Sequence, residues 1–348
     1  MLFQICSSFL FLLKQNKFND MMRRLLNRWL KPMVLLFSIG VATGVSMAQE
    51  NPIYNQYYFN YYLVNPALAG ANDCHYFMLT HKQQWMGIKD APMTTSFSYQ
   101  GRLPHNVGLG VYFYNDMNGY SIHQAGQISV AYHIPLSDGY RYKKAVARDR
   151  QLSFAVSLKF FNYGFIADEL KDVSAGDMAM QDLSSKFTIN SNVGVYFTSY
   201  GFFTGLSMTN FLRTKMPAYN KDLEPNTAIT GYFNIGNAFT LSDLDVLEPS
   251  AMFKFDFDGH LGLDVSLRYD RDMPRHKNFS WWCQATYRQN FDGPYQGIDI
   301  LPMVGFQFNK FHIAAAYDIP INKLFRHSAG SLELMLGYTL CYTKRFCR

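Results

Sequence analysis

The chain has 348 residues, of which 48% are hydrophobic and 17% aromatic, and its formal net charge is +6. Most of that charge lies in residues 1–48, which hold six basic and one acidic side chain; the other 26 basic and 25 acidic residues leave a net of +1. Because a nucleic-acid-binding domain is normally strongly basic, this balance argues against a nucleic-acid partner.

Residues 1–48 are predicted to be a signal peptide region. A basic stretch at 23–31 precedes an apolar run at 33–45, and small residues follow at the two positions that signal peptidase recognises. The run is shorter than the roughly 20 residues of a spanning helix, although a retained membrane anchor is the alternative. An earlier apolar run at 2–13 is unusual in a leader, so translation is expected to start at Met21 or Met22 and the mature chain at Gln49.

Residues 49–73 form an aromatic N-terminal segment without the alternation of a strand. Its aromatic side chains include Tyr54, Tyr57, Tyr58, Phe59, Tyr61 and Tyr62. A segment of this kind must be buried, because exposed aromatic surface is costly in water. It could plug a barrel, pack beneath one or bind a partner; plugging and packing are the favoured interpretations.

Residues 74–348 are predicted to be an all-β domain, because apolar and polar residues alternate in stretches of about ten. The stretch 261–269 places leucine, valine and tyrosine on one face, and Asp264, Ser266 and Arg268 on the other. With a secretory leader and many aromatic residues, this pattern indicates a transmembrane antiparallel β-barrel. The alternatives are a soluble sandwich, which would not explain the sustained aromatic face, and a propeller, which would show a longer repeat.

The alternation predicts about 14 strands, an even number, as expected for a bacterial outer-membrane barrel. They are expected at 75–84, 93–101, 107–115, 124–135, 151–163, 190–199, 201–210, 226–237, 249–257, 261–270, 280–290, 299–308, 311–318 and 331–342. Charged and polar residues such as His133, Lys159 and Glu333 fall on the faces opposite the apolar ones. We expect them in the lumen, because a charge facing lipid costs a few kcal/mol at the midplane.

An even strand count places both termini on one side, which we expect to be the periplasm, with the protein in the outer membrane. Short links at 102–106, 200–201 and 309–310 are then periplasmic turns, and long links at 164–189 and 211–225 are extracellular. The link at 136–150 is an exception to this rule, because it is long but falls on the periplasmic side.

Two periplasmic links are rich in basic residues. The candidate partner-binding residues are Arg141, Lys143, Lys144, Arg148, Arg150, Arg271, Arg275 and Lys277. They could simply be solvated turn residues. The alternative hypothesis is a basic docking face for a periplasmic partner.

No catalytic, cofactor-binding or metal-binding site is predicted. The chain lacks a nucleophile elbow, a zinc-protease helix and a phosphate loop. Gly108 and Gly110 lie in a strand and are better explained as a place where neighbouring side chains pack closely. Scattered histidines and aspartates could still converge in an outer-membrane protease or phospholipase, or hold calcium in a loop, but no local motif supports either activity.

Four cysteines remain after residue 48, in an oxidising compartment. They are Cys74, Cys283, Cys341 and Cys347, and they could pair in three ways. No Cys-x-x-Cys pair indicates a zinc or thioredoxin-type site.

Short motifs run through the chain in a specific order. They are Asn55-Gln56-Tyr57, Asn65-Pro66-Ala67-Leu68-Ala69-Gly70, Gln83-Gln84-Trp85-Met86-Gly87, Ala91-Pro92-Met93-Thr94, Asn115-Asp116-x-x-Gly119, Asn192-Val193-Gly194-Val195-Tyr196, Leu247-Glu248-Pro249-Ser250, Val304-Gly305-Phe306-Gln307-Phe308-Asn309 and Ser328-Ala329-Gly330-Ser331. The chain thereby resembles the PorP/SprF family of the Bacteroidetes type IX secretion system. The motif residues carried over are Gln84, Trp85, Gly87, Ala91, Pro92, Asn115, Asp116 and Gly119.

The resemblance implies a non-enzymatic outer-membrane barrel needed to export cargo proteins with a C-terminal sorting domain. It implies that the partners include a periplasmic ring lipoprotein and its companion protein, or else a peptidoglycan-binding linker protein. Cargo sorting domains and outer-membrane lipid are further implied partners. A 14-stranded barrel with a charged lumen cannot pass a folded protein. We therefore expect an anchor or adaptor; the alternative is a channel for small solutes or hydrophobic ligands.

Overall fold

The computed structural model describes residues 57, 59–72, 74–136, 150–165, 186–212, 214, 227–257, 259–273, 279–291, 297–321 and 329–341. All of them belong to one compact unit, Met47–Arg348. The predicted signal peptide region and residues 49–56 lie outside the described residues. In the described ranges, no helix is long and apolar enough to cross a membrane.

The described unit consists of strands, turns and two short 3-10 helices, η2 (Tyr61–Leu63) and η3 (Pro66–Leu68). The strands are β1 (Cys74–Gln83), β2 (Met93–Arg102), β3 (Val107–Asn118), β4 (Ser121–Pro135), β5 (Arg150–Phe165), β6 (Lys186–Ser199), β7 (Phe202–Thr209), β8 (Thr230–Asn237), β9 (Phe239–Thr240), β10 (Asp245–Asp256), β11 (Leu261–Asp272), β12 (Phe279–Asn290), β13 (Ile298–Phe308), β14 (Phe311–Pro320) and β15 (Ser331–Cys341).

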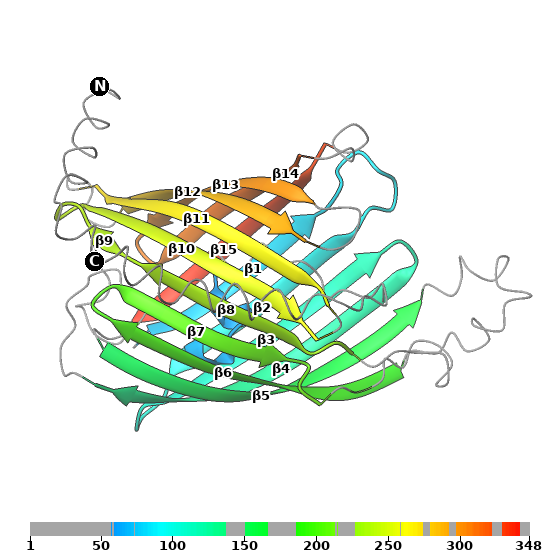
Figure 1. The fold of residues 1–348 in the computed structure, drawn as a ribbon, viewed down its shortest axis with the longest axis horizontal. Helices are drawn as coiled ribbons and strands as arrows, with labels where there is room; N and C mark the ends of the chain where they lie inside the picture. Colours follow the sequence, from blue (N-terminus) through cyan, green and yellow to red (C-terminus); the bar gives the residue numbers. More distant parts are fainter. Residues whose placement is uncertain are drawn as a thin grey trace, which may run out of the picture. The chain divides into compact units, whose positions relative to one another are not determined.

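The strands form an antiparallel meander that closes on itself, with β1 paired to β15 (Figure 1). β9 continues β8 against β10 in the same register, with Ala238 between them, so the 15 segments make 14 barrel strands. Each of the 14 predicted ranges overlaps one of these strands. The predicted transmembrane antiparallel β-barrel is therefore confirmed.

The barrel has two ends, which we name by the chain termini. The terminal rim is the end where β1 begins and β15 ends; it also carries the tight turns at 103–106, 200–201 and 309–310. The distal rim is the opposite end and carries the links 84–92 and 119–120. The predicted grouping of the three tight turns at one end is thus confirmed. Which side of the membrane that end faces stays a prediction.

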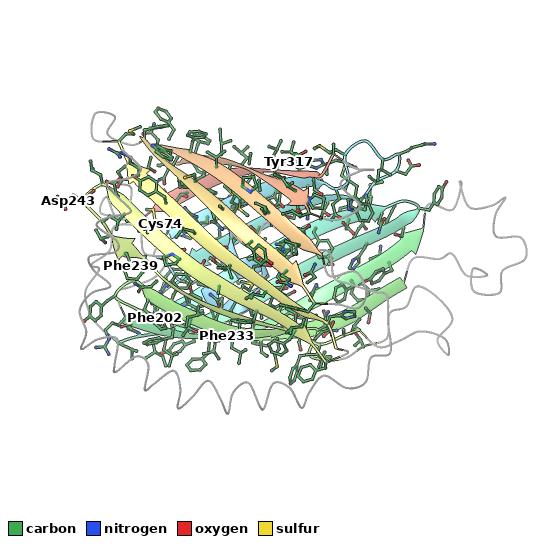
Figure 2. All side chains as sticks on the ribbon, turned by 45° about the horizontal axis from the view of Figure 1, so that its top comes forward. Cys74, Phe202, Phe233, Phe239, Asp243 and Tyr317 are labelled. Atoms are coloured by element: carbon green, nitrogen blue, oxygen red, sulfur yellow. A yellow bond between two sulfur atoms is a disulfide. The ribbon has the colours of Figure 1, made fainter. Side chains whose placement is uncertain are left out.

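The two faces of the wall have opposite chemistry. On β4, Ile128, Val130 and Tyr132 are exposed on the outer wall, whereas Gln127 and Ser129 are buried inside. The same alternation holds around the barrel, so apolar side chains cover its outside (Figure 2). A polar interior and an apolar exterior suit a wall that faces lipid. The predicted lumen positions of His133, Lys159 and Glu333 are confirmed, since all three are buried.

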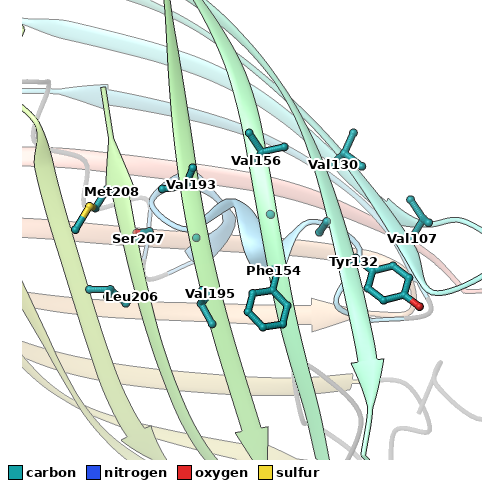
Figure 3. Close-up of a pocket in the computed structure, with 13 residues that line it drawn as sticks. Val107, Val130, Tyr132, Phe154, Val156, Val193, Val195, Leu206, Ser207 and Met208 are labelled. Carbon is teal, nitrogen blue, oxygen red and sulfur yellow. The ribbon is translucent and has the colours of Figure 1, made fainter. Parts of the chain in front are cut away.

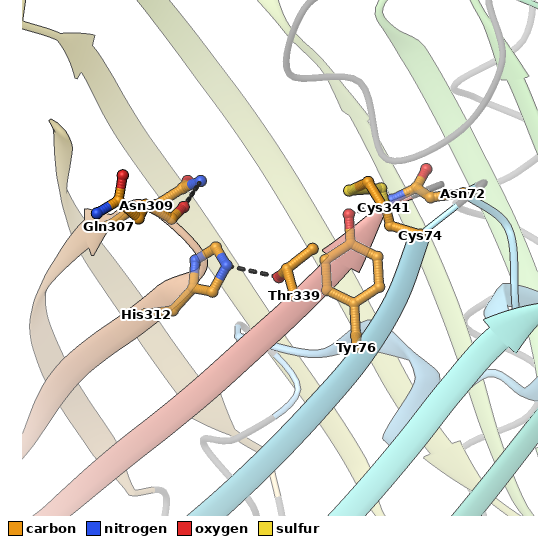
Figure 4. Close-up of a disulfide and its surroundings, with 8 residues drawn as sticks. All are labelled: Asn72, Cys74, Tyr76, Gln307, Asn309, His312, Thr339 and Cys341. Carbon is orange, nitrogen blue, oxygen red and sulfur yellow. Dashed lines mark hydrogen bonds between the residues drawn. A yellow bond between two sulfur atoms is a disulfide. The ribbon is translucent and has the colours of Figure 1, made fainter. Parts of the chain in front are cut away.

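A disulfide joins Cys74 to Cys341 at the terminal rim, where the first and last strands meet (Figure 4). The two residues are direct partners in the β1–β15 register, which brings them together. Of the three pairings that the sequence left open, the structure contains this one. Cys283 is a free, exposed cysteine on β12, and Cys347 lies outside the described residues.

Candidate functional site

The described part of the aromatic N-terminal segment, residues 57 and 59–72, lies inside the barrel. We call residues 57–72 the plug; all of them except Tyr58 are described. Two buried asparagines start its short helices: the side chain of Asn60 accepts from the amide of Tyr62, and that of Asn65 accepts from the amide of Ala67. The sequence left the placement of this segment open, and the described residues take a position inside the barrel.

The end of the plug is held at the terminal rim. Arg102 donates from Nε to the Gly70 carbonyl at 2.8 Å and from Nη2 to the Ala71 carbonyl at 3.0 Å. The buried ring of His133 lies 2.9 Å from the Ala69 carbonyl oxygen. Carbonyls that would be orphaned inside the barrel are thereby satisfied by wall side chains.

The middle of the plug is held by four different strands. Asn65 donates to the Val195 carbonyl at 3.1 Å, and Ser207 donates to the Val64 carbonyl at 2.6 Å. Asn60 Nδ2 donates to Ser98 Oγ at 3.0 Å. These three hydrogen bonds go to β6, β7 and β2, and a fourth hydrogen bond goes from the plug to β4.

That bond links the hydroxyls of Tyr62 and Ser129, 3.0 Å apart. Burial raises the pKa of the Tyr62 phenol, so it stays neutral. The apolar residues of the plug also form the buried clusters of the barrel: Tyr62 and Leu68 belong to one, Tyr57 and Val64 to the other. The barrel therefore has a packed core rather than an empty lumen.

The wall makes room for the plug with glycines. A Cβ at Gly108 would collide with the Ala69 carbonyl, and one at Gly110 would come within 2.5 Å of the Tyr62 ring. The interpretation that Gly108 and Gly110 mark a place of close packing is confirmed. A side chain at either position would displace the plug.

A charged network lies beside Tyr57. Asp264 and Arg288 are each 1% exposed, and Arg288 Nε lies 3.1 Å from Asp264 Oδ1. Lys254 Nζ lies 2.9 Å from the other carboxylate oxygen, which also accepts a hydrogen bond from the Tyr57 hydroxyl. The network ties β10, β11 and β12 to the plug. Buried charges must be paired in this way to be tolerated.

The family-motif residues gather at the distal rim. The amide of Gln84 donates to the Pro92 carbonyl at 2.8 Å, which closes the 84–92 link. Met86 exchanges backbone hydrogen bonds with the 329–330 link: its amide donates to Gly330, and the Ala329 amide donates to Met86. Two motifs about 240 positions apart therefore meet.

The other motif residues shape the same rim. Thr94 Oγ1 donates to Asp116 Oδ1 at 2.5 Å, and Gln124 Nε2 donates to Asn115 Oδ1 at 2.9 Å. Gly87 and Gly119 have φ of +94° and +56°, a region that glycine enters without strain. Trp85 is half-exposed, Ala91 is partly buried and Pro92 is buried.

The basic residues are only partly described. Arg150 is exposed at the start of β5, with its guanidinium carbon 5.9 Å from the centre of the Tyr200 ring. Arg271 is exposed near the end of β11 and lies 3.6 Å from Asp245. Both lie at the terminal rim. The other candidates, Arg141, Lys143, Lys144, Arg148, Arg275 and Lys277, lie outside the described residues.

The histidines considered for chemistry are dispersed. His123 stacks on Tyr163 in the lumen with ring centres 3.9 Å apart, whereas His81 is exposed and bonds to Thr95. Among the described residues, no group of three or more histidine, cysteine, aspartate or glutamate side chains could hold a metal ion.

A family model described as "Type IX secretion system membrane protein PorP/SprF" matches residues 46–338. No match was found among curated proteins. Solved structures with a similar fold include the Pseudomonas putida toluene transporter TodX, at 8% identity and a TM-score of 0.41, covering 86% of this chain and 95% of that one. Another is BamA from Haemophilus ducreyi lacking POTRA domains 1-3, at 8% identity and a TM-score of 0.41, covering 77% of this chain and 70% of that one.

Proposed function

This chain belongs to the PorP/SprF family of type IX secretion system membrane proteins, and we propose that it serves that system as a non-enzymatic anchor or adaptor in the outer membrane. The observation that carries the proposal is the plug. Residues 57 and 59–72 pack inside the barrel, and several of them are hydrogen-bonded to β2, β4, β6 and β7. A barrel filled by its own chain supports a role performed by its rims and outer wall.

The terminal rim is the proposed docking face for the periplasmic machinery. β1 begins and β15 ends there, and Arg150 and Arg271 lie there too, next in sequence to the links that hold the other basic candidates. We propose that this rim faces the periplasm and contacts the ring lipoprotein and its companion, or the peptidoglycan-binding linker. A rigid wall would hold these links in place as a binding surface.

The distal rim would then face the cell exterior. The family-motif links 84–92 and 329–330 meet there through backbone hydrogen bonds, which gives the rim a defined shape. We propose it as the surface that meets cargo sorting domains. Half-exposed Trp85 is a suitable contact residue, since aromatic side chains are enriched at protein interfaces.

A clean deletion of the gene tests the proposed role. We expect sorting-domain cargo to accumulate in the periplasm of the deletion strain and to be secreted again when the wild-type gene is restored. Normal secretion without the protein would refute the role. Conductance of the purified wild-type barrel in planar bilayers would favour a solute channel instead.

Charge reversal tests the docking face separately. Arg141, Lys143, Lys144 and Arg148 are replaced together by glutamate, and capture of the ring proteins is measured by co-purification. The control is Lys89→Glu, because Lys89 is an exposed cation of the distal rim. We expect capture to fall only for the terminal-rim variant; equal capture by both variants would exclude the basic docking face.

A further inference from the structure

A groove runs over the outer wall where β4, β5, β6 and β7 lie side by side (Figure 3). Its volume is about 580 Å³. The lining is apolar apart from one serine and one phenol, and includes Tyr132, Phe154, Val156, Val193, Val195 and Ser207. The groove therefore opens toward lipid and not toward the lumen.

The plug supports the floor of this groove from inside. The Val195 carbonyl accepts a hydrogen bond from Asn65, and Ser207 turns its hydroxyl inward to the Val64 carbonyl. Gly194, at the floor, has no side chain, because one there would collide with Asn65. The hollow is thus a fixed feature of the wall.

A cation lies on β5, on the same outward face as two of the groove residues. On β5, Gln151 and Ser153 are buried inside the barrel, so Arg150 falls on the outward set with Phe154 and Val156. Arg150 is exposed at the terminal rim, beside the Tyr200 ring. Among the residues that the structure describes, no carboxylate forms an ion pair with it.

The spacing between cation and groove matches one leaflet. Six residues separate Arg150 from Val156, which is about 20 Å along a strand. With the usual tilt of about 40°, this is about 15 Å along the membrane normal. That depth is half of the roughly 30 Å hydrocarbon core.

We propose that this groove binds one anionic phospholipid of the leaflet at the terminal rim. One acyl chain lies along Val156 and Val193, and the phosphate pairs with the Arg150 guanidinium. Arginine suits this role because its planar fork binds phosphate oxygens in pairs. The Tyr200 ring beside Arg150 lies next to the headgroup, at the depth where tyrosine is normally enriched.

Native mass spectrometry of the purified barrel tests the site, with phosphatidylglycerol and phosphatidylcholine offered as an equimolar mixture. We expect wild type to retain one phosphatidylglycerol. Arg150→Gln should lower the preference for it over phosphatidylcholine by about fivefold, the effect of one cation near a charged membrane surface. Val156→Trp, which fills the groove, should lower retention of both lipids.

Two matched controls complete the test. Arg271→Gln removes another outward cation of the terminal rim, which Asp245 already engages, and Leu267→Trp enlarges an exposed outer-wall residue that does not line the groove. Both should retain lipid as wild type does. The proposal is overturned if Arg150→Gln keeps the wild-type preference, if Val156→Trp keeps wild-type retention, or if the controls lose lipid equally.

Discussion

Glycines on the inner wall leave the space that the plug occupies, because a side chain at these positions would collide with it. Gly108 and Gly110 on β3 face the plug at Ala69 and Tyr62, and Gly194 on β6 faces Asn65. Each lets the plug approach the backbone of a strand. Glycine weakens a strand by itself, so its presence here is explained by what packs against it.

Gly110→Ala tests this fit. The added Cβ would lie 2.5 Å from the Tyr62 ring, so the ring must move. We expect the free energy of unfolding to fall by about 1–3 kcal/mol, the usual cost of overpacking. The measurement is chemical denaturation in detergent or liposomes. The control is Gly262→Ala, where the nearest atom is the flexible Asn290 side-chain oxygen at 3.3 Å; an equal loss in both variants would contradict the account.

The buried Asp264 is a second residue on which stability depends. Asp264→Leu removes the carboxylate whose oxygen lies 3.1 Å from Nε of the buried Arg288. Breaking such a pair costs about 3–5 kcal/mol. The double variant Asp264→Leu with Arg288→Met removes both charges and should recover part of that loss. If the double variant is no more stable than Asp264→Leu alone, loss of the Asp264–Arg288 ion pair is not the main cause of the destabilisation.

At the scale of elements, the β1–β15 seam is reinforced covalently. The Cys74–Cys341 bond spans a sequence separation of 267, and it follows directly on the plug. The bond limits the unfolded chain and fixes the place where the plug enters the barrel.

Cys74→Ser should therefore destabilise the barrel. We expect a loss of about 2–5 kcal/mol in the free energy of unfolding, reproduced by adding reductant to the wild-type protein. Cys283→Ser is the matched control, because Cys283 is exposed and forms no disulfide. A loss no larger than that of the control would show that the seam does not need the bond.

The plug is the element that closes the lumen. Removing residues 57–69 should leave a barrel that conducts small ions, whereas the wild-type barrel should be nearly silent in planar bilayers. The deletion removes the hydrogen bonds that the plug forms with Ser98, Ser129 and His133 of the wall. Identical conductance of the two proteins would show that the plug does not seal the barrel.

The sequence predicted the strands well and the interior poorly, for a physical reason. A strand's alternation depends on neighbouring residues, so stretches such as 261–269 reveal their two faces locally. The plug's path depends on contacts far apart in the chain, such as Asn65 with Val195 and Tyr57 with Asp264. Gly108 and Gly110 were the local signal of that path, but they did not identify what packs against them.

The same difference applies to the candidate sites. The motif residues Trp85 and Gly87 were identified from the family resemblance, but their meeting with the 329–330 link required the closed barrel. The Cys74–Cys341 pairing likewise follows from β1 lying beside β15, which no local pattern reveals. The sequence left Arg150 as either a solvated turn residue or part of a docking face, and the alternation of the strand against the buried Gln151 shows that it points outward.

At the scale of the whole molecule, three surfaces remain for function once the lumen is filled. The terminal rim offers basic residues, the distal rim offers the family motifs, and the outer wall offers an apolar surface with a groove. An anchor or adaptor can use all three at once, because each faces a different compartment. A conduit would have to displace a plug that is bonded to several strands.

Locking the plug in place tests this central claim most directly. Asn60→Cys and Ser98→Cys, at side chains joined by a 3.0 Å hydrogen bond, are bridged by a short reducible bifunctional thiol reagent in a Cys283→Ser background. Secretion of a sorting-domain cargo is then measured before and after bridging, with the Cys283→Ser protein alone as control. The adaptor account predicts unchanged secretion with the plug locked. Secretion that stops on bridging and resumes on reduction would contradict it.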